Sequence, residues 1–365
     1  MNDPKKEALK TGLPKWVVPL VAGFLSGVIL TLAVVGLIAV ASRRPKVPKD
    51  LPTDVEVIPE DPEKTPLFAG GAALPALDRS SAKTAVTGAE VAILLDVSTG
   101  RVIASKGGQS KFFPASITKI MTMVVACERL AVEDLDEKVT MTDELYNYVR
   151  QGGYKGSSVF PFDPGDEITV RDLLYGTGVK SYSDCTILLV RKLAESEEEF
   201  VGWMNEKAKA LGMSATHFDN VIGYESDDNY STAEDLARLT AYALGCDLIR
   251  EVLGTTEYGF YYNGYTKAGD WKENIHGTFY STLFNANGSG RIADYEKESG
   301  KKFSLAKGML GGGKTGSLKF GSSWVYSLAS YAVIDGKTYV SIVGNSDSSA
   351  GLMKDVKALF DGYID

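Results

Sequence analysis

The stretch from Phe112 to Cys127 constrains the fold of this chain more than any other, because it is uncharged except for Lys119. An ammonium group inside so much apolar surface is costly unless it is paired, uncharged or used in chemistry. On a helix, residues three apart lie on one face, so the Lys119 amine can reach the hydroxyl of Ser116. A serine beside a desolvated lysine is a typical activated nucleophile. The stretch therefore predicts a buried helix that carries a reactive pair.

The Ser-x-x-Lys spacing alone is not specific, because the chain contains it at other places. These are Ser80/Lys83, Ser299/Lys302 and Ser304/Lys307. They lie in polar surroundings where a lysine is simply solvated, so we interpret them as surface helices or loops. Only for Ser116 and Lys119 does the apolar setting favour a functional role.

Composition and charge exclude several classes of protein. The chain is 44% hydrophobic and 24% charged, which is ordinary for a globular protein. Its formal net charge of -8 argues against a nucleic-acid partner. The histidines and cysteines are His217, His276, Cys127, Cys185 and Cys246. They are not at metal-ligand spacing, so we expect no metal, no cofactor and no disulfide framework.

Residues 16–42 carry no charge over 27 positions. This exceeds the roughly 20 apolar residues that cross a bilayer, so we predict a transmembrane signal-anchor at 16–42 behind a cytoplasmic tail at 1–15. The triplet Ala39-Val40-Ala41 resembles a signal-peptidase site, which leaves cleavage as an alternative. Lysines and arginines flank the segment equally, so charge does not fix its orientation.

A proline-rich linker is predicted at 43–82. Seven of the 13 prolines fall between Pro45 and Pro75, among charged and small residues. Such a composition is typical of an extended segment. On the outer side of the membrane it would hold the following domain on the order of 100 Å from the surface.

The pattern becomes globular from about Lys83, and both ends of this region predict strands. Strands are expected at 90–96 and 101–105 around a turn, and at 327–334 and 337–343 around Asp335-Gly336. A closing helix is expected at 353–360.

The middle of the region is helical in pattern. Helices are expected at 170–174, 184–195, 198–211 and 233–244, the last after a capping box from Ser231 to Glu234. We therefore predict an α/β (α+β) domain at 83–365, with an antiparallel sheet from both ends, flanking helices and an inserted all-helical lobe. A ligand cleft is expected at the seam.

Two further motifs carry chemistry. Lys314-Thr315-Gly316-Ser317 follows three glycines and leads into a strand, and it offers a cation, hydroxyls and backbone amides. Such groups suit a substrate carboxylate and a developing oxyanion. Ser181-Tyr182-Ser183 leads into an apolar helix, where a serine is commonly only a cap.

In chain order, these motifs resemble the active-site set of the penicillin-recognising serine enzymes. The resemblance is closest to the low-molecular-mass penicillin-binding proteins of peptidase family S11, the serine-type D-Ala-D-Ala carboxypeptidases. It covers 83–365 and includes segments 94–100, 114–116, 168–176, 216–218 and 230–233. It implies a β-lactamase/transpeptidase-like fold.

The resemblance also implies catalytic roles. Ser116 would attack the carbonyl between the two terminal D-alanines, Lys119 would act as general base, and Ser181 would relay a proton to the leaving amine. Lys314 and Thr315 would hold the terminal carboxylate. Two ammonium groups in one dry pocket repel each other, so we expect Lys314 to depress the pKa of Lys119.

Other positions would bind the substrate. The backbone N–H groups of Ser116 and Ser317 would form the oxyanion hole, with Gly316 and Ser183 as further substrate-binding positions.

Three departures from the family put rate and specificity in question. Ser183 replaces the usual asparagine, Ala286 stands where some members carry a carboxylate-binding arginine, and Gly311 replaces an aspartate. Arg291, in an insertion before Lys314, is a candidate to replace that arginine.

The implied partners are peptidoglycan stem peptides ending in D-Ala-D-Ala and β-lactams as covalent inhibitors. Since the cell wall lies outside, we expect a single-pass protein of the cell membrane with an extracytoplasmic catalytic domain. Many relatives continue into a β-rich domain with its own anchor, whereas this chain ends at Asp365, so anchoring is assigned to the N-terminal segment.

Two other functions stay open. A class A β-lactamase needs a carboxylate for deacylation, commonly in a Glu-x-x-Leu-Asn loop that this chain lacks. A catalytically weakened wall-binding or sensor protein would fit the departures, but it has little use for a buried lysine at 119.

Overall fold

The computed structural model of the chain describes residues 64–70, 74–266 and 269–364. The predicted tail (1–15), the predicted anchor (16–42) and the linker up to residue 63 lie outside these residues. Within the described part of the chain, no helix combines the length and the apolar character needed to cross a membrane.

A six-stranded sheet in the order β1-β3-β2-β10-β9-β8 forms the centre of the domain. Its strands are β1 (Lys83–Thr84), β2 (Val91–Asp96), β3 (Arg101–Lys106), β8 (Met309–Phe320), β9 (Ser323–Ile334) and β10 (Lys337–Ser346). All neighbours are antiparallel except the short pair of β1 and β3. The pairing of β2 with β10 confirms that both ends of the region build one sheet, and β8 lies at its edge.

The predicted hairpins are present. Asp335 and Gly336 connect β9 to β10 with φ values of +51° and +74°, as a two-residue turn with the right-handed twist of its strands requires. Between β2 and β3, the Asp96 carboxylate accepts a hydrogen bond from the backbone N–H of Ser98.

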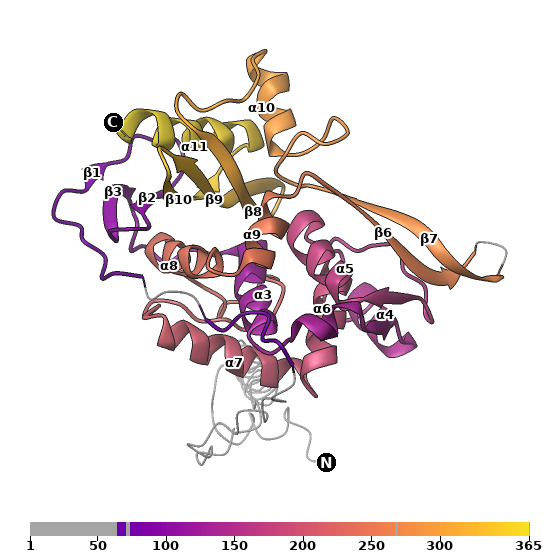
Figure 1. Cartoon of the computed structure of the whole chain (residues 1–365). Helices are drawn as coiled ribbons and strands as arrows, with labels where there is room; N and C mark the ends of the chain where they lie inside the picture. The colour runs from indigo at the N-terminus through magenta and orange to yellow at the C-terminus, as the bar shows by residue number, and fades with distance from the viewer. Residues whose placement is uncertain (1–63, 71–73, 267–268, 365) are drawn as a thin grey trace, which may run out of the picture. The chain divides into compact units, whose positions relative to one another are not determined.

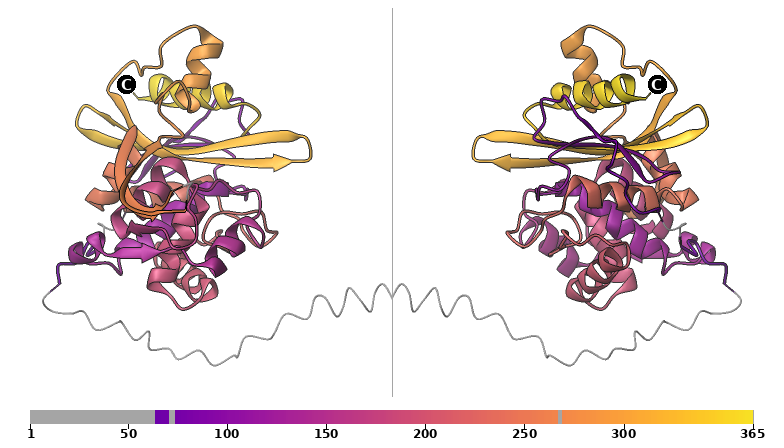
Figure 2. Two further views of the ribbon diagram at one scale, coloured as in Figure 1. Left: turned by 90° about the vertical axis from the view of Figure 1, so that its right-hand side faces the viewer. Right: turned by 90° about the vertical axis from the view of Figure 1, so that its left-hand side faces the viewer.

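Helices cover both faces of the sheet (Figures 1 and 2). Along β2, Ile93 and Leu95 belong to the core shared with the inserted lobe, whereas Ala92 and Leu94 belong to the core shared with the C-terminal helix. This alternation is the period of two expected for a strand buried on both faces. The C-terminal side carries α10 (Arg291–Ser299) and α11 (Ser349–Tyr363).

The opposite side carries the inserted lobe. Its centre is α3 (Lys119–Cys127), which is buried along its whole length, as its apolar sequence requires. Around it lie η1 (Ala115–Thr118), η2 (Val132–Asp136), α4 (Asp143–Arg150), α5 (Val170–Tyr175), the π-turn η3 (Gly176–Lys180), α6 (Ser183–Leu193), α7 (Glu197–Ala210), α8 (Ala233–Ala243) and α9 (Asp247–Gly254). The four predicted helices are confirmed as α5, α6, α7 and α8.

The lobe is not all-helical, so this part of the prediction is wrong. It contains a four-stranded sheet of β4 (Lys138–Thr140), β5 (Glu167–Thr169), β6 (Glu257–Tyr265) and β7 (Trp271–Tyr280). Strands as short as β4 and β5 carry too few residues to show an alternating pattern. The β6–β7 hairpin extends beyond the lobe (Figure 1).

The start of α8 also differs in detail from the prediction. Thr232, not Ser231, is the N-cap, and its hydroxyl accepts a hydrogen bond from the N–H of Asp235. Glu234 is engaged elsewhere, since it forms an ion pair with Arg79.

Residues 64–70 and 74–82, here called the N-terminal strap, pack on the domain. The Phe68 side chain is buried, and its ring centroid lies 5.3 Å from that of Tyr242 on α8. Leu77 is also buried. The packed part of the chain therefore begins before residue 83, the boundary that the sequence predicted.

Candidate active site

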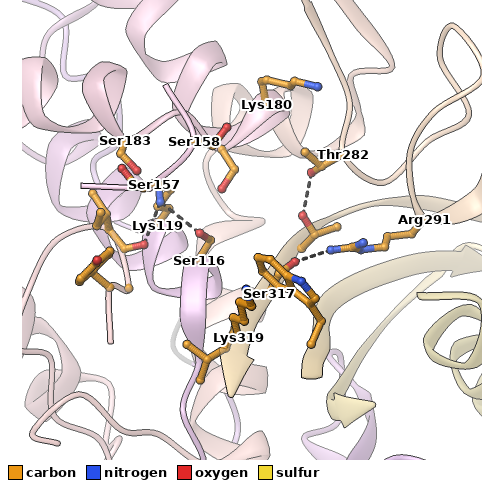
Figure 3. A pocket seen from close by; sticks show the side chains of 18 of the residues that line it. Ser116, Lys119, Ser157, Ser158, Lys180, Ser183, Thr282, Arg291, Ser317 and Lys319 are labelled. Carbon is orange, nitrogen blue, oxygen red and sulfur yellow. Dashed lines mark hydrogen bonds between the residues drawn. The ribbon is translucent and has the colours of Figure 1, made fainter. Parts of the chain in front are cut away.

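A 740 Å³ cavity lies between the edge strand β8 and the inserted lobe (Figure 3). It is lined by the predicted site residues Ser116, Lys119, Ser181, Ser183, Thr315 and Ser317. Lys314 is fully buried and reaches Ser181. The structure thus brings the three sequence motifs together at one place.

The nucleophile candidate lies on the short turn that leads into α3. Ser116 is the second residue of η1, and Lys119 is the first residue of α3. The Lys119 Nζ donates to Ser116 Oγ over 3.2 Å and to the carbonyl oxygen of Ile222 over 2.8 Å (Figure 3). Since Lys119 is 1% exposed, its amine meets these acceptors in a dry environment.

Burial lowers the pKa of Lys119 to about 7, although the nearby Asp184 carboxylate acts in the opposite direction. A base whose pKa lies near the working pH is both available and strong enough to accept a proton. Lys119 therefore has the position and the basicity to activate the Ser116 hydroxyl.

Ser181 adopts a left-handed conformation, with φ +65° and ψ +29°, between η3 and α6. This conformation is uncommon for a residue with a Cβ, and it is often found at functional sites. It directs the hydroxyl to the second buried lysine: the Lys314 Nζ donates to Ser181 Oγ over 2.8 Å and to the carbonyl oxygen of Thr315 over 3.1 Å.

The pKa of Lys314 is lowered, first by burial and then by the charges of Lys119 and Arg291. The sequence predicted that Lys314 would depress the pKa of Lys119. Instead, burial is the main cause of the lowered pKa at both lysines. A carboxylate bound beside Lys314 would raise its pKa again.

Ser183 is the first residue of α6, and its side chain lines the cavity. Its backbone N–H donates to the carbonyl oxygen of Ser158 over 2.8 Å. The next residue, Asp184, is fully buried and forms an ion pair of 3.1 Å with Arg150. Burial raises the pKa of Asp184 to about 6.

Gly316 lies on β8 beside the turn that carries Ser116. A Cβ at this position would lie 3.0 Å from the carbonyl oxygen of Pro114 and 3.3 Å from the Cβ of Ala115. The missing side chain therefore allows β8 to lie against the turn that carries Ser116.

The sequence analysis missed the loop that contacts Lys119 from the other side. Ile222 accepts its hydrogen bond, and Gly223 packs on the turn before Ser116. Gly223 has φ +73°, and a Cβ there would lie 1.8 Å from the carbonyl oxygen of Ala115. The available signal in the sequence was Gly223 after the apolar Val221 and Ile222. The sequence did not reveal that Gly223 contacts Ala115.

Thr282 was also missed. Its hydroxyl shares a hydrogen bond of 2.7 Å with the hydroxyl of Thr315 (Figure 3). Thr282 belongs to the segment that follows β7, so the long hairpin returns the chain to the cavity.

Arg291, at the start of α10, reaches the cavity as the sequence suggested. Its guanidinium donates to the hydroxyl of Ser317 and, over 3.4 Å, to that of Ser349. It also lies 4.5 Å from the ring centroid of Tyr326. The insertion thus supplies a held cation that Ala286 cannot provide.

Comparisons with known proteins show which family the chain resembles. The sequence profile of peptidase family S11, D-alanyl-D-alanine carboxypeptidase, matches residues 78–288. The D-alanyl-D-alanine carboxypeptidase DacF of Bacillus subtilis is 36% identical over 170 residues, which are 46% of this chain and 42% of DacF. DacC of Escherichia coli is 38% identical over 149 residues, 40% of this chain and 37% of DacC. This chain thus matches less than half the length of these two relatives.

A longer match is found in Streptomyces. The D-alanyl-D-alanine carboxypeptidase of strain K15 is 29% identical over 275 residues, 73% of this chain and 84% of that protein. The crystal structure of the Streptomyces K15 DD-transpeptidase superposes with a TM-score of 0.61 at 27% identity, over 76% of this chain and 97% of that chain. Because the family profile matches more than half of the chain, the chain belongs to peptidase family S11, the D-alanyl-D-alanine carboxypeptidases.

Proposed function

We propose that this protein is a serine-type D-Ala-D-Ala carboxypeptidase that shortens peptidoglycan stem peptides by one D-alanine through an acyl-enzyme. The observation that carries the proposal is the buried Lys119 amine 3.2 Å from Ser116 Oγ, in a cavity that also holds the Lys314–Ser181 pair. A purely binding protein would gain nothing from two desolvated amines beside two hydroxyls.

Acylation uses the first pair. Lys119 takes the proton of the Ser116 hydroxyl as its oxygen attacks the carbonyl carbon between the two D-alanines. The resulting oxyanion accepts hydrogen bonds from the backbone N–H groups of Ser116 and Ser317. The C–N bond then breaks, and the leaving amine takes a proton from Ser181, which is reprotonated within the Lys119 and Lys314 network.

The other end of the cavity binds the terminal carboxylate. Lys314, Thr315 and Thr282 supply a cation and two hydroxyls, and Arg291 supplies a planar guanidinium suited to a carboxylate. Water, activated by Lys119, then attacks the ester carbonyl, releases the shortened peptide and restores the Ser116 hydroxyl.

Two measurements on the same protein test the proposal. Incubation with diacetyl-L-Lys-D-Ala-D-Ala should release free D-alanine, and fluorescent penicillin should label the protein covalently. Ser116→Ala should abolish both, whereas Ser80→Ala, in one of the surface Ser-x-x-Lys sequences, should change neither. Labelling of the Ser116→Ala protein would overturn the assignment.

Transpeptidation is a second candidate, favoured by the similarity to the Streptomyces K15 DD-transpeptidase. An amine would then replace water as the acceptor of the same acyl group. An amine acceptor such as glycylglycine is added, and the two products are quantified. A new peptide joined to the acceptor indicates transpeptidation, and the free acid indicates hydrolysis. Rapid nitrocefin turnover would instead favour a β-lactamase.

The place of action follows from the substrate. We assign residues 16–42 to a single membrane anchor, with the catalytic domain outside the cytoplasm, because the segment is uncharged over 27 positions. Fractionation of cells, followed by protease treatment of intact spheroplasts, tests both parts. Recovery of the full-length chain in the soluble cytoplasmic fraction would contradict them.

A further inference from the structure

The cavity is lined by more positive than negative side chains, although the whole chain has a net charge of -8. The basic residues are Lys119, Lys155, Lys180, Arg291 and Lys319, and the acidic ones are Glu225 and Asp294. Lys119 and Arg291 are used by the proposed function, and the Asp294 carboxylate accepts a hydrogen bond from the Ser349 hydroxyl. Three lysines therefore remain without an assigned role.

One of these lysines belongs to the carboxylate end of the cavity. Lys180 follows Val179, whose carbonyl oxygen accepts from the N–H of Thr282 over 3.1 Å, and Figure 3 shows Lys180 on the Thr282 side. In the same view Ser157 and Ser183 lie across Ser116 from Arg291 and Thr282. This opposite side is where the acyl part of a substrate would lie.

Lys155 lies two residues before Ser157, on a cavity-lining loop held at two points. Its carbonyl oxygen accepts from the Tyr224 hydroxyl over 3.0 Å, and the Ser158 carbonyl accepts from the Ser183 N–H over 2.8 Å. Between them, the Ser157 hydroxyl is buried on the cavity wall and has no hydrogen-bond partner in the described structure. A buried, unsatisfied donor is costly unless a ligand uses it.

Lys319 approaches the same end from β8. Side chains two positions apart on a strand share a face at a spacing of about 7 Å, and Thr315, Ser317 and Lys319 all line the cavity. With the terminal carboxylate beside Thr315 and the attacked carbonyl beside Ser317, the next step along the strand leads to the residues that precede the cleaved bond. Lys319 is therefore placed toward the acyl part.

Neither Lys155 nor Lys319 forms an ion pair with any residue that the structure describes. Unpaired cations at the rim of a concave site attract anions and raise their local concentration. We propose that Lys155, Ser157 and Lys319 form an anion-binding rim that selects acidic acyl donors, namely stem peptides with a free carboxylate upstream of D-Ala-D-Ala rather than the amidated form. This inference rests on the proposed function and specifies its substrate.

A matched pair of peptides tests the rim. Both end in L-Lys-D-Ala-D-Ala after a γ-linked D-glutamyl residue, whose α-carboxylate is free in one and amidated in the other. The quantity measured is the ratio of kcat/KM, acidic over amidated, from D-alanine release at low ionic strength. Exposed charge pairs predict a ratio of roughly two to five for each lysine that contacts the carboxylate. The ratio should fall toward one as salt is added.

Substitutions at Lys155 and Lys319 then test whether their charges cause the preference. The double variant Lys155→Gln/Lys319→Gln should bring the ratio to about one, and Lys155→Arg/Lys319→Arg should retain the preference because the charge is kept. Lys83→Gln, on the short strand β1 away from the cavity, is the matched control and should keep the wild-type ratio. The proposed anion-binding rim is overturned if the wild-type ratio is one, or if the double glutamine variant keeps the preference for the acidic peptide.

Failure of the rim and failure of the proposed function remain distinguishable. If neither peptide releases D-alanine, the carboxypeptidase proposal fails, and binding of both peptides to the Ser116→Ala protein is measured by calorimetry. Tighter binding of the acidic peptide, lost in the double glutamine variant, would support the rim independently of turnover. Equal binding or no binding of the two peptides would overturn it.

Discussion

The Lys119 side-chain nitrogen lies 2.8 Å from the carbonyl oxygen of Ile222, a residue 103 positions away in the sequence. This hydrogen bond fixes the amine within 3.2 Å of Ser116 Oγ. A carbonyl accepts from the amine whether it is neutral or charged, so the contact orients the base without an ion pair. The loop before α8 therefore positions the amine that we propose as the general base.

The first prediction concerns pH. Only the neutral Lys119 amine accepts a proton, and its pKa is about 7. The rate constant for acylation by fluorescent penicillin should rise about tenfold per pH unit below pH 7 and level off above it. Stopped-flow labelling from pH 5.5 to pH 9 measures this profile. An inflection near pH 10 would show that the amine is solvated, and Lys119→Arg should not label at any pH.

Asp184→Asn should move that profile. The Asp184 carboxylate raises the pKa of Lys119, so its neutralisation lowers the lysine pKa and shifts the acid limb of acylation to lower pH. Asp184 is also the ion-pair partner of Arg150, and the loss of a hydrogen bond to a charged group costs about 1–3 kcal/mol of unfolding free energy. An unshifted acid limb in a folded variant would contradict the proposed electrostatic link.

Gly223→Ala should disable the site, with Gly212→Ala as its matched control. Both glycines have positive φ, +73° and +71°, but only a Cβ at 223 meets other atoms, whereas nothing lies within 4 Å at 212. The control should cost about 1–2 kcal/mol from backbone strain alone. The variant at 223 should lose more stability and most of its penicillin labelling, because Ala115 must move. Equal melting temperatures and equal labelling rates would exclude this role.

Arg291→Ala should weaken cleavage of peptides that end in a free carboxylate. Loss of a charge-assisted hydrogen bond is expected to reduce kcat/KM by roughly 10- to 100-fold, mainly through KM. Arg291→Lys should recover only part of the activity, since an ammonium lacks the planar fork. Lys297→Ala, on the same helix α10, is the control. A peptide with an amidated C-terminus should be cleaved equally poorly by wild type and Arg291→Ala.

The N-terminal strap predicts a difference between two truncations. A chain that begins at residue 64 keeps Phe68, Leu77 and the Arg79–Glu234 ion pair, whereas one that begins at residue 83 loses them. Removal of one buried phenylalanine typically costs about 3–5 kcal/mol. The shorter chain should therefore melt at a clearly lower temperature in calorimetry. Equal melting temperatures would mean that the strap adds no stability.

Features with a local cause were predictable from the sequence. The Ser116–Lys119 spacing, the apolar α3 and the Asp335-Gly336 turn each depend on neighbouring residues, and the structure places them as expected. The family resemblance, which rests on the order of the three motifs along the chain, added the prediction that these motifs share one site.

Features that depend on distant contacts were not predictable in this way. Gly223 and Ile222 look like ordinary loop residues until the fold brings them against Ala115 and Lys119. The strands β4 and β5 have no pattern of their own, because each pairs over only three residues. The electrostatics of the two lysines also depend on the fold, because burial, the main cause of both lowered pKa values, is set by packing from distant segments.

The open edge of β8 has a consequence for recognition. An extended peptide laid along that edge would add another strand to the sheet and be held through main-chain amides and carbonyls. Main-chain pairing of this kind does not depend on which side chains lie beside the cleaved bond. Under the proposed function, discrimination between stem peptides would then come from the two ends of the groove, where a change such as amidation alters binding without any change in the catalytic residues.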